Sequence, residues 1–289
     1  MTRSHAPHGG RRFLPAFALL SLLAVGTGCV IAAAHDVPTG SWARNPVAWL
    51  VGALAAWAIA ARTGAPRVVL LMAPVALAGT LLNAPQDGVH RWIDVGPLHV
   101  NAAFVLLPAA IVALAVFAER RWSWIAAAVA LVLLVVQPDA SQATALGAAM
   151  LVVLASLRAS AAVRAGGAAA VVLAIVGAWM RPDPLAPVPE VEEIIGLAWG
   201  WTPAAAIAAV ALLGATALVP LRMATADGPR TRMAAMALAT YCAVVSLAPV
   251  LGAFPVPLVG MGMSAILGFW LGAGALAAAA RPGGNERAS

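Results

Sequence analysis

A charged residue and an aromatic residue stand side by side in a sequence that is otherwise mostly apolar. The stretch GVHRWIDVGP at 88–97 places Arg91 next to Trp92, and Asp94 follows. A guanidinium can hydrogen-bond to phosphate oxygens in pairs, and an indole ring favours the membrane–water interface. The stretch therefore predicts binding of a phosphorylated lipid headgroup. An interfacial tryptophan beside an arginine that reaches toward ordinary headgroups is the simpler explanation.

Two further stretches carry carboxylates that could do chemistry. QPDAS at 137–141 contains Asp139, and VPEVEE at 188–193 contains Glu192 and Glu193. A glutamate partly buried below the headgroups has a raised pKa, which a general base near neutral pH requires. Asp139 suits the orientation of an arginine or a sugar hydroxyl. The simpler explanation is that these acids cap helices or complement the positive ends of helix dipoles.

The composition places these residues in a membrane protein. Hydrophobic residues make up 63% of the 289 positions and charged residues only 10%, far from the balance of a soluble domain. Lysine is absent, so all 17 basic residues are arginines, and the net charge is +6. Because the arginines are spread between apolar runs instead of forming a basic patch, we expect membrane lipids as partners and no nucleic acid.

Ten apolar runs are candidates for membrane-spanning helices, each close to the roughly 20 residues that a bilayer requires. We therefore predict an all-α, polytopic membrane helix bundle in a single domain over 1–289, with short external loops at 84–100, 137–141 and 181–193. The first run continues to Ala34, past Cys29, and we interpret it as a membrane helix instead of a cleaved export signal. The ten runs lie near residues 13–34, 46–61, 67–83, 101–118, 122–137, 141–157, 164–180, 194–219, 233–253 and 257–280.

The arginines also predict the orientation of the bundle. With both termini in the cytoplasm, fourteen of the 17 arginines fall in cytoplasmic segments, as the positive-inside rule requires, and only Arg44, Arg91 and Arg181 fall outside. The acids have the opposite bias, with eight of eleven outside. The regular alternation supports ten spans and places the candidate chemistry at the outer face.

Taken in order, these stretches resemble the SEDS family of shape, elongation, division and sporulation proteins, which includes FtsW, RodA and SpoVE. GVHRWIDVGP at 88–97 is similar to the family's GxxRWIxxGP, and QPDASQAT at 137–144 to its QPDxGT. The segment LAPVLGAFPVPLVGMGMSAILGFWLGAGAL at 247–276 follows the family pattern LPVTGxPLPFVSYGGSS in order and spacing. The resemblance covers most of the chain after residue 40 and implies ten helices with cytoplasmic ends in a bacterial inner membrane.

The resemblance implies a peptidoglycan glycosyltransferase that polymerises lipid II, an undecaprenyl-diphosphate-linked disaccharide, in cell division or elongation beside a class B penicillin-binding protein. Glu192 or Glu193 would be the catalytic base and Asp139 an orienting carboxylate. The diphosphate would contact Arg91 and Arg181, with a divalent cation as a further candidate stabiliser. Trp92 and Asp94 would complete the substrate-binding residues.

Departures from the family pattern keep a second hypothesis open. The loop before the eighth span has about thirteen residues and lacks the family's TDF aspartate, and GMGMSA at 260–265 replaces a hydroxyl-rich segment. A non-catalytic relative that binds lipid-linked precursors, or that scaffolds a cell-wall synthesis complex, fits these losses. An unrelated transporter fits less well, because transporters usually place ionisable groups near the middle of the membrane and almost none of the acids here lie mid-span.

Overall fold

The computed structural model describes residues 8–62, 67–96, 98–181, 183–224 and 228–281, with side chains from residue 13 onward. These residues form one antiparallel hairpin of two strands, β1 (Trp92–Val95) and β2 (Leu98–Asn101), and two short 3-10 turns after α11 and α12. Everything else that is regular in the described ranges is helical. The helices are α1 (His8–Ala34), α2 (Thr39–Trp42), α3 (Arg44–Ala60), α4 (Arg67–Thr80), α5 (Ala102–Val116), α6 (Arg121–Val136), α7 (Ala140–Ser156), α8 (Ala161–Trp179), α9 (Pro189–Glu192), α10 (Ile194–Trp201), α11 (Pro203–Leu218), α12 (Pro229–Leu247) and α13 (Met263–Ala279).

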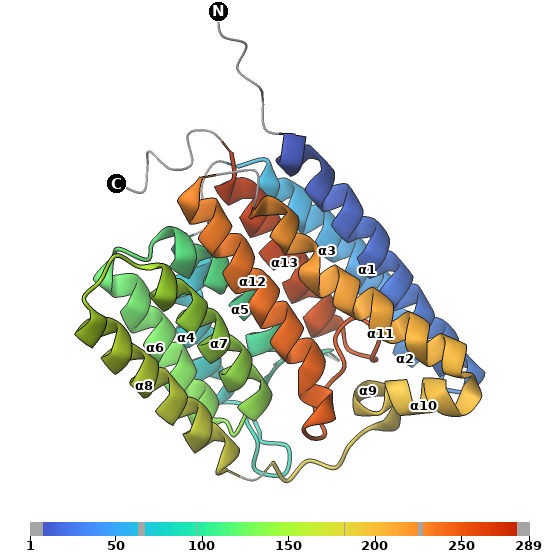
Figure 1. Cartoon of the computed structure of the whole chain (residues 1–289). Helices are drawn as coiled ribbons and strands as arrows, with labels where there is room; N and C mark the ends of the chain where they lie inside the picture. The colour runs from blue at the N-terminus through green and yellow to red at the C-terminus, as the bar shows by residue number, and fades with distance from the viewer. Residues whose placement is uncertain (1–7, 63–66, 97, 182, 225–227, 282–289) are drawn as a thin grey trace, which may run out of the picture.

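The predicted all-α polytopic membrane bundle is confirmed. Four helical stretches, 13–34, 161–179, 203–223 and 229–250, are long and apolar enough to cross a membrane, and α4 to α7 and α13 are shorter apolar helices. Every one of the ten predicted spans coincides with a helix or with a pair of consecutive helices. Figure 1 shows these helices packed side by side, with α8 along one edge and α1 along the other.

The core of the bundle lies around α5 and α13, which pack against each other. Thirteen of the fifteen residues of α5 are buried, whereas α8 buries only Val171 and Ala178. Small residues permit this close packing: a Cβ on Gly268 would lie 1.8 Å from the carbonyl oxygen of Phe104, and one on Gly274 would lie 2.7 Å from the Cα of Ala56. Without a hydrophobic difference between lipid and side chains, such close contacts hold membrane helices together.

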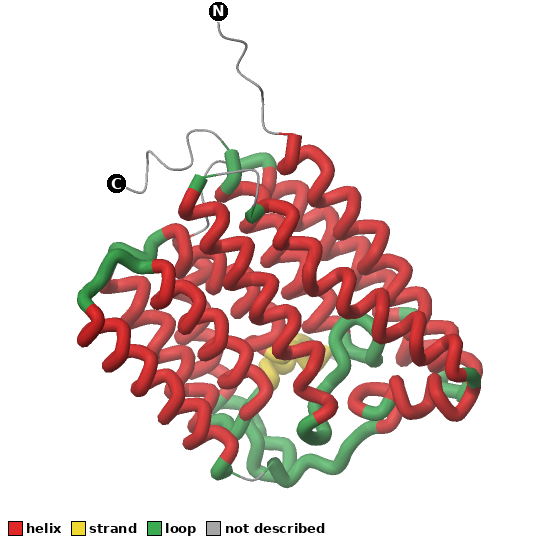
Figure 2. The backbone as a smooth tube through the Cα atoms, in the orientation of Figure 1, coloured by secondary structure: helices red, strands yellow, loops and turns green. Residues whose placement is uncertain are grey.

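The two ends of the bundle differ in structure. The first turn of α1 and the last turn of α13 lie at the same end (Figure 1). The β-hairpin and the segment from α8 to α10 lie toward the opposite end, where Figure 2 shows strands and loops close together. The hairpin was not predicted within the loop 84–100. Its two strands are joined through Gly96, which has a positive φ of 60°, and pair Trp92 with Asn101.

The predicted eighth span, 194–219, is two helices instead of one. Thr202 is extended, with φ −157° and ψ 132°, and separates α10 from α11. The ring of the following Pro203 disfavours helical geometry at the residue before it, and proline itself suits the first turn of α11. Glu192 ends the separate short helix α9, so it does not share a continuous helical face with Gly196 and Trp199 of α10.

The predicted tenth span also begins later than expected, because residues 251–262 are not helical apart from turns. This segment folds back into the bundle. The backbone N–H of Val256 donates to the carbonyl of Val191 at 3.0 Å, and that of Met261 donates to the carbonyl of Glu190 at 2.9 Å. Irregular backbone within a membrane bundle is tolerated where protein satisfies its polar groups. The segment therefore anchors α9 and lines the space beneath it.

Candidate functional site

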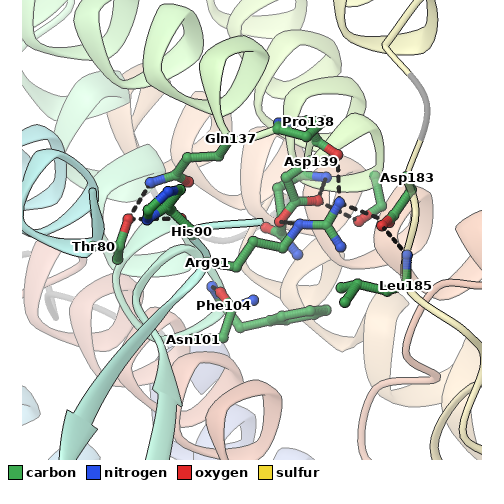
Figure 3. A network of polar contacts seen from close by, with 12 residues as sticks. Thr80, His90, Arg91, Asn101, Phe104, Gln137, Pro138, Asp139, Asp183 and Leu185 are labelled. Atoms are coloured by element: carbon green, nitrogen blue, oxygen red, sulfur yellow. Dashed lines mark hydrogen bonds and ion pairs between the residues drawn. The ribbon is translucent and has the colours of Figure 1, made fainter. Parts of the chain in front are cut away.

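Arg91 lies at the centre of a buried polar network just before β1. Its Nη2 is 2.7 Å from Oδ2 of Asp183 and also donates to the carbonyl oxygen of Pro138 (Figure 3). Its Nε lies 3.6 Å from Oδ2 of Asp139 and has no hydrogen-bond partner. Only 6% of Arg91 is exposed. A buried guanidinium needs such partners, because an uncompensated charge at low dielectric is strongly unfavourable.

Asp139 is both the helix cap and an ion-pair partner. Its Oδ1 accepts hydrogen bonds from the backbone N–H of Gln142 at 3.2 Å and from the hydroxyl of Ser141 at 3.0 Å, which caps α7. The side chain of Gln142 in turn accepts a 2.5 Å hydrogen bond from Tyr241 on α12. Asp139 therefore has both of the roles that its sequence context allows: it caps α7 and it pairs with Arg91. The residue that donates to its carboxylate, Gln142, is itself hydrogen-bonded to α12.

The backbone on either side of the arginine is fixed by side chains from other helices. The hydroxyl of Thr80 donates to the carbonyl of His90 at 2.8 Å, and the amide of Gln137 donates to the hydroxyl of Thr80 at 2.5 Å (Figure 3). On the other side, Nδ2 of Asn83 donates to the carbonyl of Trp92 at 3.0 Å. The ends of α4 and α6 thus set the position of the hairpin before any ligand arrives.

Arg91, Asp139 and Asp183 open onto a cavity of about 380 Å³, named the polar cavity. Its charged lining residues are Arg91, Asp139, Asp183 and Glu192, with Trp92 also in the wall. With all four groups ionised, the lining carries one positive and three negative charges, a net charge of −2. The folded-back segment 251–262 forms part of the floor. The polar cavity therefore joins four charged side chains that are up to about one hundred residues apart.

Glu192 has the environment that a general base needs. Burial raises the pKa of its carboxyl above the ordinary value, hydrogen bonds from backbone N–H groups partly oppose that shift, and the nearby charges of Asp183 and Glu190 raise the pKa further. One of the backbone donors is the N–H of Val188, which lies 2.7 Å from Oε2. Its pKa is therefore shifted toward the range in which proton transfer at neutral pH is efficient.

Three of the predicted site residues lie outside the polar cavity. Glu193 lies at the turn between α9 and α10. This turn leaves its side chain exposed, whereas the side chain of Glu192 lines the polar cavity. Asp94 is exposed and pairs across the hairpin with His99, whose Nδ1 is 2.6 Å away. Arg181 is exposed in the segment after α8. The structure brings together Arg91, Trp92, Asp139 and Glu192 from the predicted set and leaves these three apart.

Asp183 is the cavity residue that was not predicted. It lies in the loop RPDPLAPVPE, and its carboxylate makes the shortest ion pair with Arg91, at 2.7 Å. The only signal in the sequence was an acid between two prolines in the external loop 181–193. Residues 91 and 183 belong to different external loops, and no spacing rule relates them, so their contact could not be derived from local patterns.

A second, larger depression adjoins the polar cavity. This apolar groove has a volume of about 760 Å³ and is lined mostly by aliphatic side chains from α10, α11 and α12. Glu192 and Val256 line both the apolar groove and the polar cavity. Glu193 lines the apolar groove alone. A ligand with a charged head and a long apolar tail would occupy two such adjoining spaces.

The described residues do not form a ready-made metal site. No group of three His, Cys, Asp or Glu side chains among them is arranged to hold a metal ion. Of the three carboxylates in the polar cavity, Asp139 and Asp183 are already engaged with Arg91. The candidate divalent cation therefore has no preformed protein site here, and no step is assigned to it.

The chain is similar to known proteins in fold and not in sequence. No protein-family model matches the sequence, and no curated protein matches it either. Among solved structures, the Thermus thermophilus rod shape determining protein RodA is similar, with a TM-score of 0.67, 19% identity, and coverage of 91% of this chain and 94% of RodA. An aspartate-to-alanine variant of that RodA matches with a TM-score of 0.67, 17% identity, and coverage of 91% and 95%.

A third solved structure comes from a peptidoglycan synthase complex that coordinates polymerization and crosslinking. The match has a TM-score of 0.59 and 18% identity, and covers 90% of this chain and 95% of that one. All three likenesses extend over nearly the full length of both chains, at identities where fold is shared although most residues differ. The chain therefore has the fold of the SEDS family, as the motifs at 88–97, 137–144 and 247–276 predicted.

Proposed function

We propose that the chain is a peptidoglycan glycosyltransferase that polymerises lipid II at the outer face of a bacterial inner membrane, working as a single transmembrane domain. One observation carries the proposal: the polar cavity and the apolar groove meet at Glu192, in a bundle with the fold of RodA. The cavity would hold a diphosphate and its sugar, and the groove would hold the polyprenyl chain. A site of this shape is suited to a lipid-linked sugar rather than to a free nucleotide sugar.

In the proposed reaction, Glu192 is the general base. Its carboxylate takes the proton from a hydroxyl of the acceptor sugar, and the freed oxygen attacks the anomeric carbon of the donor. A new glycosidic bond forms as the bond to the diphosphate breaks, and undecaprenyl diphosphate leaves with the electron pair. The raised pKa of Glu192 matches this role, because the base must accept a proton from a weakly acidic hydroxyl.

Arg91 would stabilise the negative charge that develops on the leaving diphosphate. In the structure it is held by Asp139 and Asp183, so a diphosphate must compete with at least one of these carboxylates. Asp183 is the partner we expect to move, because its side chain is 23% exposed and lies in a loop, whereas that of Asp139 is 4% exposed and caps α7. Asp139 would stay in place and orient the guanidinium.

Two further assignments follow from the proposed activity. Glycan polymerisation is completed by crosslinking, and the third similar structure belongs to a complex that couples the two reactions. We therefore infer a class B penicillin-binding protein as partner. Trp92, in the wall of the polar cavity, would pack against the sugar ring of the substrate.

A non-catalytic precursor-binding or scaffolding protein is the second candidate. The observation that favours it is the charge of the polar cavity, where three carboxylates surround one arginine that is already paired. Such a site repels a diphosphate until a carboxylate is displaced or protonated. This candidate predicts that the chain binds lipid II and does not polymerise it.

Two neighbouring glutamates give a matched test. We expect Glu192→Gln to lower lipid II polymerisation by the purified, reconstituted chain at least about 100-fold, because general base catalysis contributes about that much or more. Glu193→Gln removes the same charge one residue away, from an exposed side chain that lines the apolar groove and not the polar cavity. Because glutamine keeps the shape of the side chain, the groove is preserved and the rate should stay within about two-fold. Gel analysis of labelled glycan chains measures both.

The outcomes separate the candidates. Equal activity in the Glu192→Gln variant and in the unaltered chain would remove Glu192 from the mechanism. Binding of lipid II with no polymer from the unaltered chain, alone or with its penicillin-binding protein, would favour the second candidate. A chain that neither binds nor polymerises lipid II would contradict both.

A further inference from the structure

A third cavity lies at the end of the bundle opposite the polar cavity. It has a volume of about 830 Å³ and is formed where α5 and α7 end and α12 begins. Its charged lining residues are Arg158, Arg230, Arg232 and Glu119. We name it the arginine pocket. With three arginines and one glutamate, its lining carries a net charge of +2 at neutral pH.

Arg158 and Arg232 keep donors available for a ligand. No described residue forms a hydrogen bond or an ion pair with the guanidinium of Arg158, which is exposed. Arg232 donates its Nε–H to the carbonyl of Ala224 at 3.0 Å, which fixes the base of the guanidinium. Arg230 lies 3.8 Å from Glu119, whose side chain is 78% exposed. An ion pair at this distance from an exposed carboxylate contributes little and can be shared with an anion.

Apolar side chains lie next to the arginines of the pocket, on the side toward the middle of the bundle. Met233 and Met236 line the pocket three and four residues after Arg230 and Arg232. Residues at these separations lie one helical turn apart on the same face. Since α12 begins at this end and runs toward the other, each methionine lies one turn deeper in the bundle than its arginine. Met236 is 39% exposed, so the apolar wall reaches the outside of the bundle.

This layering matches a lipid better than a small soluble anion. A phosphate from solution would need only the arginines, whereas the methionines one turn deeper provide a surface for acyl chains. Basic pockets between membrane helices on the positively charged side commonly take anionic headgroups. We propose that the arginine pocket binds the phosphodiester headgroup of an anionic phospholipid from this leaflet, with the acyl chains lying along the methionine side of α12.

The test is lipid binding by the full chain, purified in detergent and stripped of lipid. Native mass spectrometry with added phosphatidylglycerol, phosphatidylcholine or inorganic phosphate distinguishes the sources of the phosphate group. We expect phosphatidylglycerol adducts to persist, phosphatidylcholine adducts to be lost at the same concentration, and inorganic phosphate at equal concentration not to displace phosphatidylglycerol. Equal retention of the two lipids, or full displacement by inorganic phosphate, would overturn the proposal.

Single variants locate the binding. Arg232→Gln and Arg158→Gln should each weaken phosphatidylglycerol binding about five-fold, since each basic residue near an anionic lipid contributes about 1 kcal/mol. Arg158→Gln removes no contact with a described residue, so its effect cannot come from a disturbed fold. Arg62→Gln is the matched control, because Arg62 is exposed just after α3 at the same end of the bundle. An equal loss in the control would overturn the proposal.

Discussion

The polar cavity and the arginine pocket use the same basic side chain in opposite ways. In the polar cavity a single arginine is 6% exposed and paired with two aspartates, and carboxylates exceed arginines by three to one. In the arginine pocket the ratio is reversed, and Arg158 is exposed without a described partner. The first arrangement fixes the position of a charge, and the second leaves charge available at the surface.

This difference shows that an arginine cannot be assigned to a ligand from its type and location alone. Arg91 first holds its own loop together, and it can serve a diphosphate only by exchanging one partner for another. A buried ion pair costs desolvation and is retained where geometry matters, so exchange at this site would couple ligand binding to the loop that carries Asp183. The arginine pocket needs no such exchange.

The largest expected difference between the polar cavity and the arginine pocket is in the effect of removing an arginine from each, Arg91 or Arg158. Arg91→Ala should destabilise the protein by about 3–5 kcal/mol, because it leaves the buried carboxylate of Asp139 and the partly buried one of Asp183 without their cation. Arg158→Ala should change stability by less than about 0.5 kcal/mol, as is usual for an exposed side chain without partners. Thermal unfolding of both variants in the same detergent measures the difference. Similar melting temperatures for the two variants would contradict the structural role of Arg91.

The exchange of partners at Arg91 gives a second, smaller effect. Asp183→Asn keeps the shape of the side chain and removes the charge that competes with a diphosphate. Undecaprenyl diphosphate should therefore bind at least about ten-fold more tightly, since a close charge pair typically contributes about 1.5 kcal/mol or more. A titration with the lipid, followed by calorimetry or by fluorescence of Trp92 and its neighbours, measures the change. Weaker binding to the variant would mean that Asp183 contacts the ligand directly.

The smallest expected effect is on the pH dependence of polymerisation. Glu192 must be deprotonated to act as a base, and its pKa is raised, so the rate should increase with pH through a value above the ordinary glutamate pKa of about 4.3. Because the charge of Asp183 contributes to raising that pKa, Asp183→Asn should move this acidic limb to lower pH. An acidic limb at the same pH in both proteins would mean that the pH dependence of the rate does not reflect the pKa of Glu192.

The same shift affects stability in a defined direction. A carboxyl whose pKa is raised on folding contributes stability at low pH, and this contribution is lost as the pH rises through the raised pKa. The free energy of unfolding of the unaltered chain should therefore fall over that pH range, and Glu192→Gln should remove the fall. Thermal unfolding over the same pH series measures it.

The sequence predicted the helices well and their interruptions poorly. Runs of apolar residues determine where a chain can cross a membrane, so each of the ten predicted spans has a counterpart among α1 to α13. The break at Thr202 follows from a local rule about the residue before proline and could have been predicted. The folded-back segment 251–262 could not, because it depends on hydrogen bonds to the carbonyls of Val191 and Glu190, far away in the chain.

The candidate site was likewise predicted only in part. Residue types identified Arg91, Asp139 and Glu192 as capable of chemistry, and the structure places all three in one cavity. Nothing in the sequence separates Glu192 from Glu193, since the turn between α9 and α10 decides which side chain faces inward. Asp183 reaches the site because the loop after α8 brings its carboxylate to 2.7 Å from Nη2 of Arg91. The sequence thus predicts which side chains can take part in chemistry, whereas the fold determines which of them meet in one cavity.

The central claim is that the polar cavity and the apolar groove form one site for a lipid-linked sugar diphosphate. A structure of the full chain with bound lipid II tests it most directly. The account predicts that the diphosphate lies beside Arg91 with Asp183 displaced, that the sugar lies near Glu192, and that the polyprenyl chain follows the groove between α10, α11 and α12. A headgroup bound away from Arg91, or a polyprenyl chain on another face of the bundle, would contradict it.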